Sequence, residues 1–300
     1  RQTDFTQLDI ETSFLDENQI LSLMEDMLYK LMKDVKGIEI PLPFLRMTWE
    51  DAMNKYGIDK PDNRFGMELQ DLTDLFKGSE FVPFKNALDN GGVIKGIVVE
   101  DFQPSNKEIK KLTSDARKNG ANGLVVLKYA NGAFAGSAVK SLTEEELNGL
   151  KEQLNLADGS SVLIVSDSWL KACTALGALR NDMGAMKGLK KKDEFSFLWV
   201  VDFPMFEWSE TENRWVSQHH PFTMPKREDI PLLDTNPEAV KTNAYDCVLN
   251  GYELGGGSLR IYENELQEKI FEILGFTEDQ IRQKFGFFID AFQYGTPPHG

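Results

Sequence analysis

Basic residues, cysteines and long apolar runs are all scarce in this 300-residue chain. Its 33 basic and 48 acidic residues give a formal net charge of −15. This charge excludes a protein that wraps nucleic acid over its whole surface, although a local contact with RNA remains compatible with it. No stretch approaches the roughly 20 apolar residues that span a bilayer, so we expect no contact with a membrane. Cys173 and Cys247 lie far apart without metal-ligand spacing, which favours two reduced core residues in a cytosolic protein.

Several catalytic motifs are also missing. The chain has no HExxH or C-x-x-C pattern for zinc and no G-x-S-x-G elbow for a serine nucleophile. It has neither a Walker A motif nor a G-x-G-x-x-G after a strand, so a nucleotide would have to lie on an antiparallel sheet. The first residues, RQTDFTQLDIE, show no signal-peptide pattern.

The chain begins with two contrasting patterns. Residues 4–14 alternate between apolar and polar side chains, which predicts a half-buried strand of an antiparallel sheet. Asp16 then opens a helical pattern that ends near Gly37. A second helix is expected from Thr48 to Tyr56, followed by a polar loop, YGIDKPDNRF.

In the middle of the chain, continuous apolar runs of strand length alternate with helical stretches. The apolar runs are Val93–Val99, Leu124–Ala130 and Ser161–Asp167, and the helical stretches are Asn106–Asn119, Thr143–Leu154 and Ser168–Arg180. This pattern predicts an α+β module with its own core. A basic linker at Lys187–Lys192 and aromatic-rich strand material at Phe195–Trp208 follow, so we expect a sheet domain interrupted by an inserted domain.

The stretch NGYELGGGSLR, from Asn250 to Arg260, contains three consecutive glycines between Glu253 and Arg260. Glycines allow unusual backbone dihedrals and close approach of a ligand, and arginine offers a bidentate fork for a carboxylate. The stretch therefore suits a site with a metal-nucleotide at one end and a carboxylate at the other. A glycine-rich hairpin turn with two solvent-facing charges is the alternative.

Other polar residues are candidates for the same site. On a strand, Gln7, Asp9 and Glu11 would share one face, which suits an ammonium group or metal but also a plain solvent face. His219 and His220 are adjacent, so at most one is expected to reach a shared site; a surface pair is the alternative. 

Asp246 and Glu253 form a second acidic pair, seven residues apart. Mg²⁺ prefers one or two carboxylates together with substrate oxygens. Beside a glycine-rich segment that could hold phosphates, the two residues are a reasonable magnesium site.

Several strings of this sequence occur in the same order in bacterial-type aspartyl-tRNA synthetases, a class II family. They are FTQLDIE (5–11), YGIDKPDNR (56–64), HHPFTMP (219–225), AYDCVLNGYELGGGSLRIY (244–262) and FGFFIDAFQYGTPPHG (285–300). The resemblance implies an α+β fold, in which a class II antiparallel sheet with flanking helices is interrupted by a smaller α+β insertion similar to the GAD domain. The implied boundaries are 1–69 and 188–300 for the two parts of the catalytic domain and 70–187 for the insertion.

The resemblance also implies roles at the amino-acid end of the site. Asp9 matches the residue that holds the α-ammonium of aspartate, and Arg260 matches the arginine that binds the side-chain carboxylate. His219 matches a histidine near that carboxylate. Arg260 should discriminate against asparagine, because a buried guanidinium facing a neutral amide loses a charge-assisted pair.

At the nucleotide end, the resemblance implies ATP as a substrate and Mg²⁺ as its partner. Phe5 matches an aromatic residue that stacks on adenine, with Gln7 in the same cleft and Glu11 close to the adenylate. Asp246 and Glu253 match the acidic pair associated with Mg²⁺ and ATP. The implied reaction is attack of aspartate on ATP to give aspartyl-adenylate, followed by transfer to tRNA.

Two further expectations follow from the resemblance. The parent enzyme would be a homodimer. The chain begins in the middle of motif 2 and ends before motif 3, so we expect a fragment that is inactive alone in ATP–pyrophosphate exchange. The alternatives are a non-catalytic module that binds tRNA or a partner protein, and a paralogue resembling an aspartate–ammonia ligase. An asparaginyl-tRNA synthetase is a nearer relative, but GGGSLR with a double histidine favours an acidic substrate.

Overall fold

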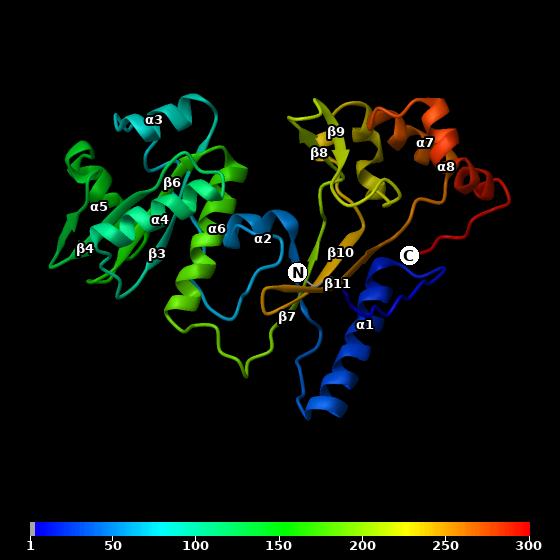
Figure 1. Ribbon diagram of the computed structural model, residues 1–300, viewed down its shortest axis with the longest axis horizontal. Helices are drawn as coiled ribbons and strands as arrows, with labels where there is room; N and C mark the ends of the chain where they lie inside the picture. Colours follow the sequence, from blue (N-terminus) through cyan, green and yellow to red (C-terminus); the bar gives the residue numbers. More distant parts are fainter. Residues whose placement is uncertain (1–3) are drawn as a thin grey trace. The chain divides into compact units, whose positions relative to one another are not determined.

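The computed structural model describes residues 4–300, and it divides the chain into two compact units. The first unit combines residues 1–49, 197–248 and 253–300, and the second combines residues 50–196 and 249–252. In Figure 1 the second unit contains the cyan and green elements from α3 to α6. The predicted insertion at 70–187 lies within this second unit, which also takes in residues 50–69 and 188–196.

The first unit contains a four-stranded sheet in the order β1-β7-β10-β11. Its strands are β1 (Leu45–Thr48), β7 (Phe197–Val201), β10 (Ala244–Leu249) and β11 (Tyr252–Ser258). β1 runs parallel to β7, with Leu45 opposite Leu198, so the expectation of a purely antiparallel sheet is wrong at this pair. The physical reason is the connection: parallel neighbours need a long crossover, and all of residues 49–196 lie between these two strands.

Helix α1 (Glu17–Leu31) begins where the sequence predicts. Asp16 caps it: its carboxylate accepts from the backbone N–H of Gln19, and the Gln19 side chain accepts from the backbone N–H of Asp16. A short π-helix, η1 (Met32–Lys36), continues it to Gly37, which adopts φ = 68°. Glycine accepts this left-handed conformation without a steric penalty, so the helix ends there.

The strand predicted at residues 4–14 is not formed. Residues 5–12 have no regular secondary structure, and Phe5 and Leu8 are about 70% exposed (71% and 70%). A strand needs a neighbour to pair its backbone groups. Within the described residues, the segment's pairing is limited to its end, where Thr12 exchanges backbone bonds with Gly300 and Phe14 donates to the carbonyl of Pro298.

The remaining elements of the first unit follow β7. They are β8 (Phe206–Ser209), β9 (Arg214–Ser217), the 3₁₀ segments η3 (Arg227–Asp234) and η4 (Pro237–Ala239), α7 (Asn264–Ile273) and α8 (Glu278–Phe292). Phe222, Phe271 and Phe285 pack together between α7 and α8, with the rings of Phe271 and Phe285 stacked at 4.9 Å. This aromatic core holds residue 222, which lines the site described below.

The second unit is built on a five-stranded sheet in the order β2-β3-β6-β4-β5, in which all four neighbouring pairs are antiparallel. Its strands are β2 (Gln70–Asp71), β3 (Val93–Val99), β4 (Val125–Ala130), β5 (Ala133–Ala135) and β6 (Ser161–Asp167). Its helices are α2 (Trp49–Tyr56), α3 (Val82–Asp89), α4 (Asn106–Lys118), the 3₁₀ turn η2 (Val139–Ser141), α5 (Glu144–Gln153) and α6 (Trp169–Met186). α6 packs on β3 and β6, and α4 packs beside α6. The strands and helices predicted in this region are confirmed.

A buried arginine connects α6 to the loop that follows α2. Arg180 is fully buried, and its Nη2 donates to the carbonyls of Asp62 (3.0 Å), Phe65 (2.7 Å) and Gly66 (2.8 Å). Its guanidinium also lies over the rings of Tyr56 and Phe65, at 4.7 and 4.1 Å from their centroids. These contacts explain why residues 56–66 belong to the second unit. Across the described residues, no helix is long and apolar enough to cross a membrane.

Candidate active site

Arg260 lies just after β11, where the backbone is held on two sides. Its N–H donates to the carbonyl of His299 at 2.9 Å, and the residue forms an antiparallel bridge with Thr223. The residue is half-buried. Because its backbone is fixed, the guanidinium can be presented at a defined place.

The guanidinium of Arg260 contacts His220. Nη1 of Arg260 lies 2.6 Å from Nε2 and 3.1 Å from Nδ1 of the imidazole, and the N–H of Phe222 donates to Nδ1 at 3.2 Å. Burial, followed by the charges of Arg260 and His219, lowers the pKa of His220 from 6.5 to about 4. The imidazole is therefore neutral at pH 7, and the whole positive charge stays on Arg260.

A pocket of about 230 Å³ forms around this guanidinium. Its lining residues are Glu11, Phe222, Arg260, Phe288 and His299. One cation and one anion face a space with aromatic walls, which is the charge pattern that a zwitterionic amino acid requires. A small acid with an ammonium group would find a partner for each of its charges.

Tyr245, a buried residue of β10, lies near the site without lining the pocket. Burial, with smaller contributions from Glu17 and Glu11, raises the pKa of its hydroxyl to about 12. The tyrosine is therefore a neutral group close to Glu11 and Arg260. A Cβ on Gly257 would lie 2.9 Å from its ring, so glycine at 257 leaves room for the ring.

Two of the three glycines of β11, Gly256 and Gly257, serve close packing rather than unusual dihedrals. None of Gly255, Gly256 and Gly257 has a positive φ, and all three belong to a regular strand. A Cβ on Gly256 would lie 2.3 Å from Oδ1 of Asp246, so the absence of a side chain there makes room for that carboxylate. The expectation of unusual backbone dihedrals is wrong at these positions; Gly256 and Gly257 instead allow the close approach of two side chains of β10, Asp246 and Tyr245.

The two predicted metal ligands lie on neighbouring strands. Asp246 is half-buried on β10, and Glu253 is exposed on β11. Carboxylate oxygens are the hard ligands that Mg²⁺ prefers, and one or two of them suffice when phosphates supply the rest. The donor types therefore fit magnesium, and the missing side chain of Gly256 gives the Asp246 carboxylate room on the sheet. Within residues 4–300, no group of three or more His, Cys, Asp or Glu residues is arranged to hold a metal ion by itself.

The other predicted residues lie on the exposed segment at the start of the chain. Gln7 donates to Asp9 at 2.5 Å, while Phe5 is 71% exposed, and none of the three lines the pocket around Arg260. Of the polar trio predicted to share one strand face, the structure brings only Glu11 to the pocket.

Of the two adjacent histidines, the structure places His220 and not His219 against Arg260. The ring of His219 instead packs edge-on against Phe203, at 4.4 Å between centroids. The strand argument allowed only one of the adjacent pair to reach the site, and the family resemblance pointed to His219, whereas the structure brings His220 to Arg260. Phe222, in a turn, and Phe288, inside α8, were also missed, since an aromatic residue gives no sequence signal that separates the wall of a site from the core.

The whole chain, residues 1–300, matches the family model of tRNA synthetases class II (D, K and N), and the chain belongs to this family. An aspartate–tRNA(Asp/Asn) ligase from Geobacillus sp. (strain WCH70) is 49% identical to it, and an aspartate–tRNA ligase from Geobacillus kaustophilus (strain HTA426) is 48% identical. Both matches cover 100% of this chain, which spans about half the length (51%) of each relative. The resemblance to bacterial aspartyl-tRNA synthetases is thereby confirmed.

Proposed function

We infer that the chain forms the amino-acid end of an aspartate–tRNA ligase site, in which aspartate is activated by ATP and transferred to tRNA. The observation that carries this function is the Arg260 guanidinium, held by a neutral His220 in a pocket that also presents Glu11. The guanidinium would bind the side-chain carboxylate. The match to class II synthetases over the whole chain supports the same reaction class.

The reaction needs no protein nucleophile. The α-carboxylate of aspartate attacks the α-phosphorus of ATP, the bond to pyrophosphate breaks, and the adenylate then passes its aspartyl group to a terminal ribose hydroxyl of tRNA. Arg260 fixes the substrate by its side chain, and such positioning contributes much of the rate in two-substrate reactions. Magnesium, held by Asp246 and Glu253, would supply charge neutralisation for the phosphates.

The remaining roles are part of the same proposal. Phe5 would stack on adenine with Gln7 in the same cleft, Asp9 would hold the ammonium group, and His219 would lie near the side-chain carboxylate. The segment 70–187 would be the GAD-like insertion between catalytic segments 1–69 and 188–300. The parent enzyme would act as a homodimer, and the two buried thiols of the chain suit a cytosolic setting.

The test is a segment exchange. Residues 1–300 replace the equivalent half of the Geobacillus sp. (strain WCH70) ligase, and ATP–pyrophosphate exchange is measured with aspartate and with asparagine. We expect exchange that depends on aspartate. In the Arg260→Gln variant we expect kcat/KM for aspartate to fall by about 100-fold or more, because about 3 kcal/mol of charge-assisted bonding is lost.

Arg227→Gln is the matched control, since it removes an exposed arginine of the same unit that pairs with Glu263. We expect it to change kcat/KM less than twofold. Equal exchange with asparagine, or an Arg260→Gln variant as active as the Arg227→Gln control, would contradict the proposed role of the pocket.

A further inference from the structure

Helix α4 carries a concentration of positive charge that is unusual for this chain. Five of its thirteen residues are basic and two are acidic, a net of +3, whereas the whole chain has a net charge of −15. The basic residues are Lys107, Lys110, Lys111, Arg117 and Lys118, and all five are exposed. An exposed basic helix on an acidic protein points to a specific anionic partner.

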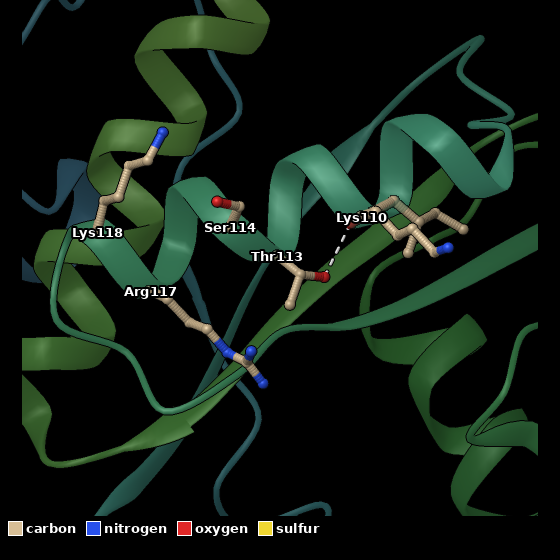
Figure 2. Close-up of a pocket in the computed structure, with 6 residues that line it drawn as sticks. Lys110, Thr113, Ser114, Arg117 and Lys118 are labelled. Atoms are coloured by element: carbon tan, nitrogen blue, oxygen red, sulfur yellow. Dashed lines mark hydrogen bonds between the residues drawn. The ribbon is translucent and has the colours of Figure 1, made fainter.

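The basic residues lie on the side of α4 that faces away from its own core. At 100° per residue, they fall on an arc of about 120° opposite the buried Leu112 and Ala116. An open hollow of about 520 Å³ follows this surface, lined by Ile109, Lys110, Thr113, Ser114, Arg117 and Lys118. Figure 2 shows the Lys118, Ser114 and Arg117 side chains projecting from the helix along its length.

The acidic residues of α4 are already engaged. Glu108 completes the capping box with Ser105, and Asp115 pairs with Lys111 and Lys118. Across the described residues 4–300, no ion pair involves Lys110 or Arg117; the Nε of Arg117 donates to the carbonyl of Asn122. Lys110 and Arg117 lie about 10 Å apart along the helix axis, and their charges are therefore available to an anionic partner.

Helix stability does not account for this arrangement. Arg117 and Lys118 in the last turn favour the helix dipole, but Lys107 in the first turn opposes it. The basic arc runs through the whole helix instead of clustering at its C-terminal end. Binding to an extended anion explains a charge distribution that the helix itself does not require.

We propose that this surface of α4 binds the phosphate backbone of RNA, with tRNA as the RNA; the partner rests on the proposed function. Lysine, arginine and the hydroxyls of serine and threonine are the groups that contact phosphates, and Thr113 and Ser114 alternate with the cations here. The surface carries no aromatic side chain, which a protein-binding hot spot or a membrane-inserting helix would present. Its role is to position the backbone, not to read bases.

The test measures the affinity of the complete chain for fluorescently labelled tRNA by anisotropy, from 50 to 200 mM salt. A Lys110→Ala/Arg117→Ala double variant removes two phosphate contacts. We expect its Kd at 50 mM salt to rise at least about 10-fold and the slope of log K against log salt to fall by about 1.5.

The control is Lys77→Ala/Lys140→Ala, which removes two exposed lysines of the same unit outside α4. Equal effects of the two double variants would overturn the proposal, as would equal affinity for a poly-glutamate 20-mer, which would assign the surface to acidic proteins.

Aspartate binding by calorimetry separates the two proposals: Arg260→Gln should abolish it without changing tRNA affinity, and the α4 variant should do the reverse.

Discussion

Replacing the buried Arg180 by methionine tests what holds the second unit together. Methionine has a similar length but no hydrogen-bond donor, so three backbone carbonyls lose their bonds to Nη2. The carbonyl of Gly66 also loses a bond to Nε at 3.2 Å. Each bond to a charged donor contributes about 1.5–3 kcal/mol. Burying the guanidinium costs several kcal/mol, and the same burial lowers the pKa of Arg180 to about 10. The net loss in free energy of unfolding is therefore about 3 kcal/mol.

The assay is thermal and urea unfolding of the complete chain. For a unit of this size, we expect Tm to fall by about 6–12 °C. Arg117→Met is the matched control, because it makes the same change at an exposed site and should shift the free energy by less than about 0.5 kcal/mol. Arg180→Lys, which keeps the charge but not the planar fork, should lie between them. A loss below about 1 kcal/mol for Arg180→Met would refute the reasoning, because the desolvation of the guanidinium would then cancel its bonds.

Three other changes have defined outcomes. The pKa of His220 is about 4 in the folded state and 6.5 in the unfolded state, so the unfolded state binds more protons between these two pH values. The free energy of unfolding should therefore rise by up to about 3 kcal/mol from pH 4 to 6.5. In urea titrations, His220→Asn should remove this rise. Gly256→Ala should cost about 1–3 kcal/mol through overpacking, while Gly255→Ala, with open space around its Cβ, should cost under about 0.5 kcal/mol; equal costs would count against the close approach. Trp199→Phe should cost about 1–3 kcal/mol because the buried Glu25 loses its donor at 3.0 Å, whereas Glu25→Gln keeps an acceptor and should cost less.

Local signals explain which parts of the fold could be predicted. Asp16 and Gln19 cap α1 through neighbouring residues, and the apolar runs of β3 and β6 are buried over most of their length. The alternation at residues 4–14 carried the same kind of signal, but a strand also needs a partner strand, which no local pattern provides. The burial of Arg180 could not be predicted from the sequence, because a single arginine in an apolar helix is expected to be exposed. The carbonyls that bind it lie more than a hundred positions away in the chain.

The same limit applies to the candidate site. Arg260 could be chosen as a candidate because arginine after a glycine run has a recognisable chemistry, and the structure places it in a pocket. His220 could not, since the choice between two adjacent histidines depends on how the backbone turns at Pro221. The neutrality of its imidazole follows from burial and from Arg260, both of which are properties of the folded chain.

The glycine run of β11 has a thermodynamic consequence for binding. Of its three glycines, only Gly255 has open space where a side chain would stand, because the Asp246 carboxylate and the Tyr245 ring lie against Gly256 and Gly257. Ordering a flexible side chain on association costs about 0.5–1.5 kcal/mol, and a ligand that lies against Gly255 avoids that cost at this position. There, the entropy that remains to be lost is that of the ligand itself.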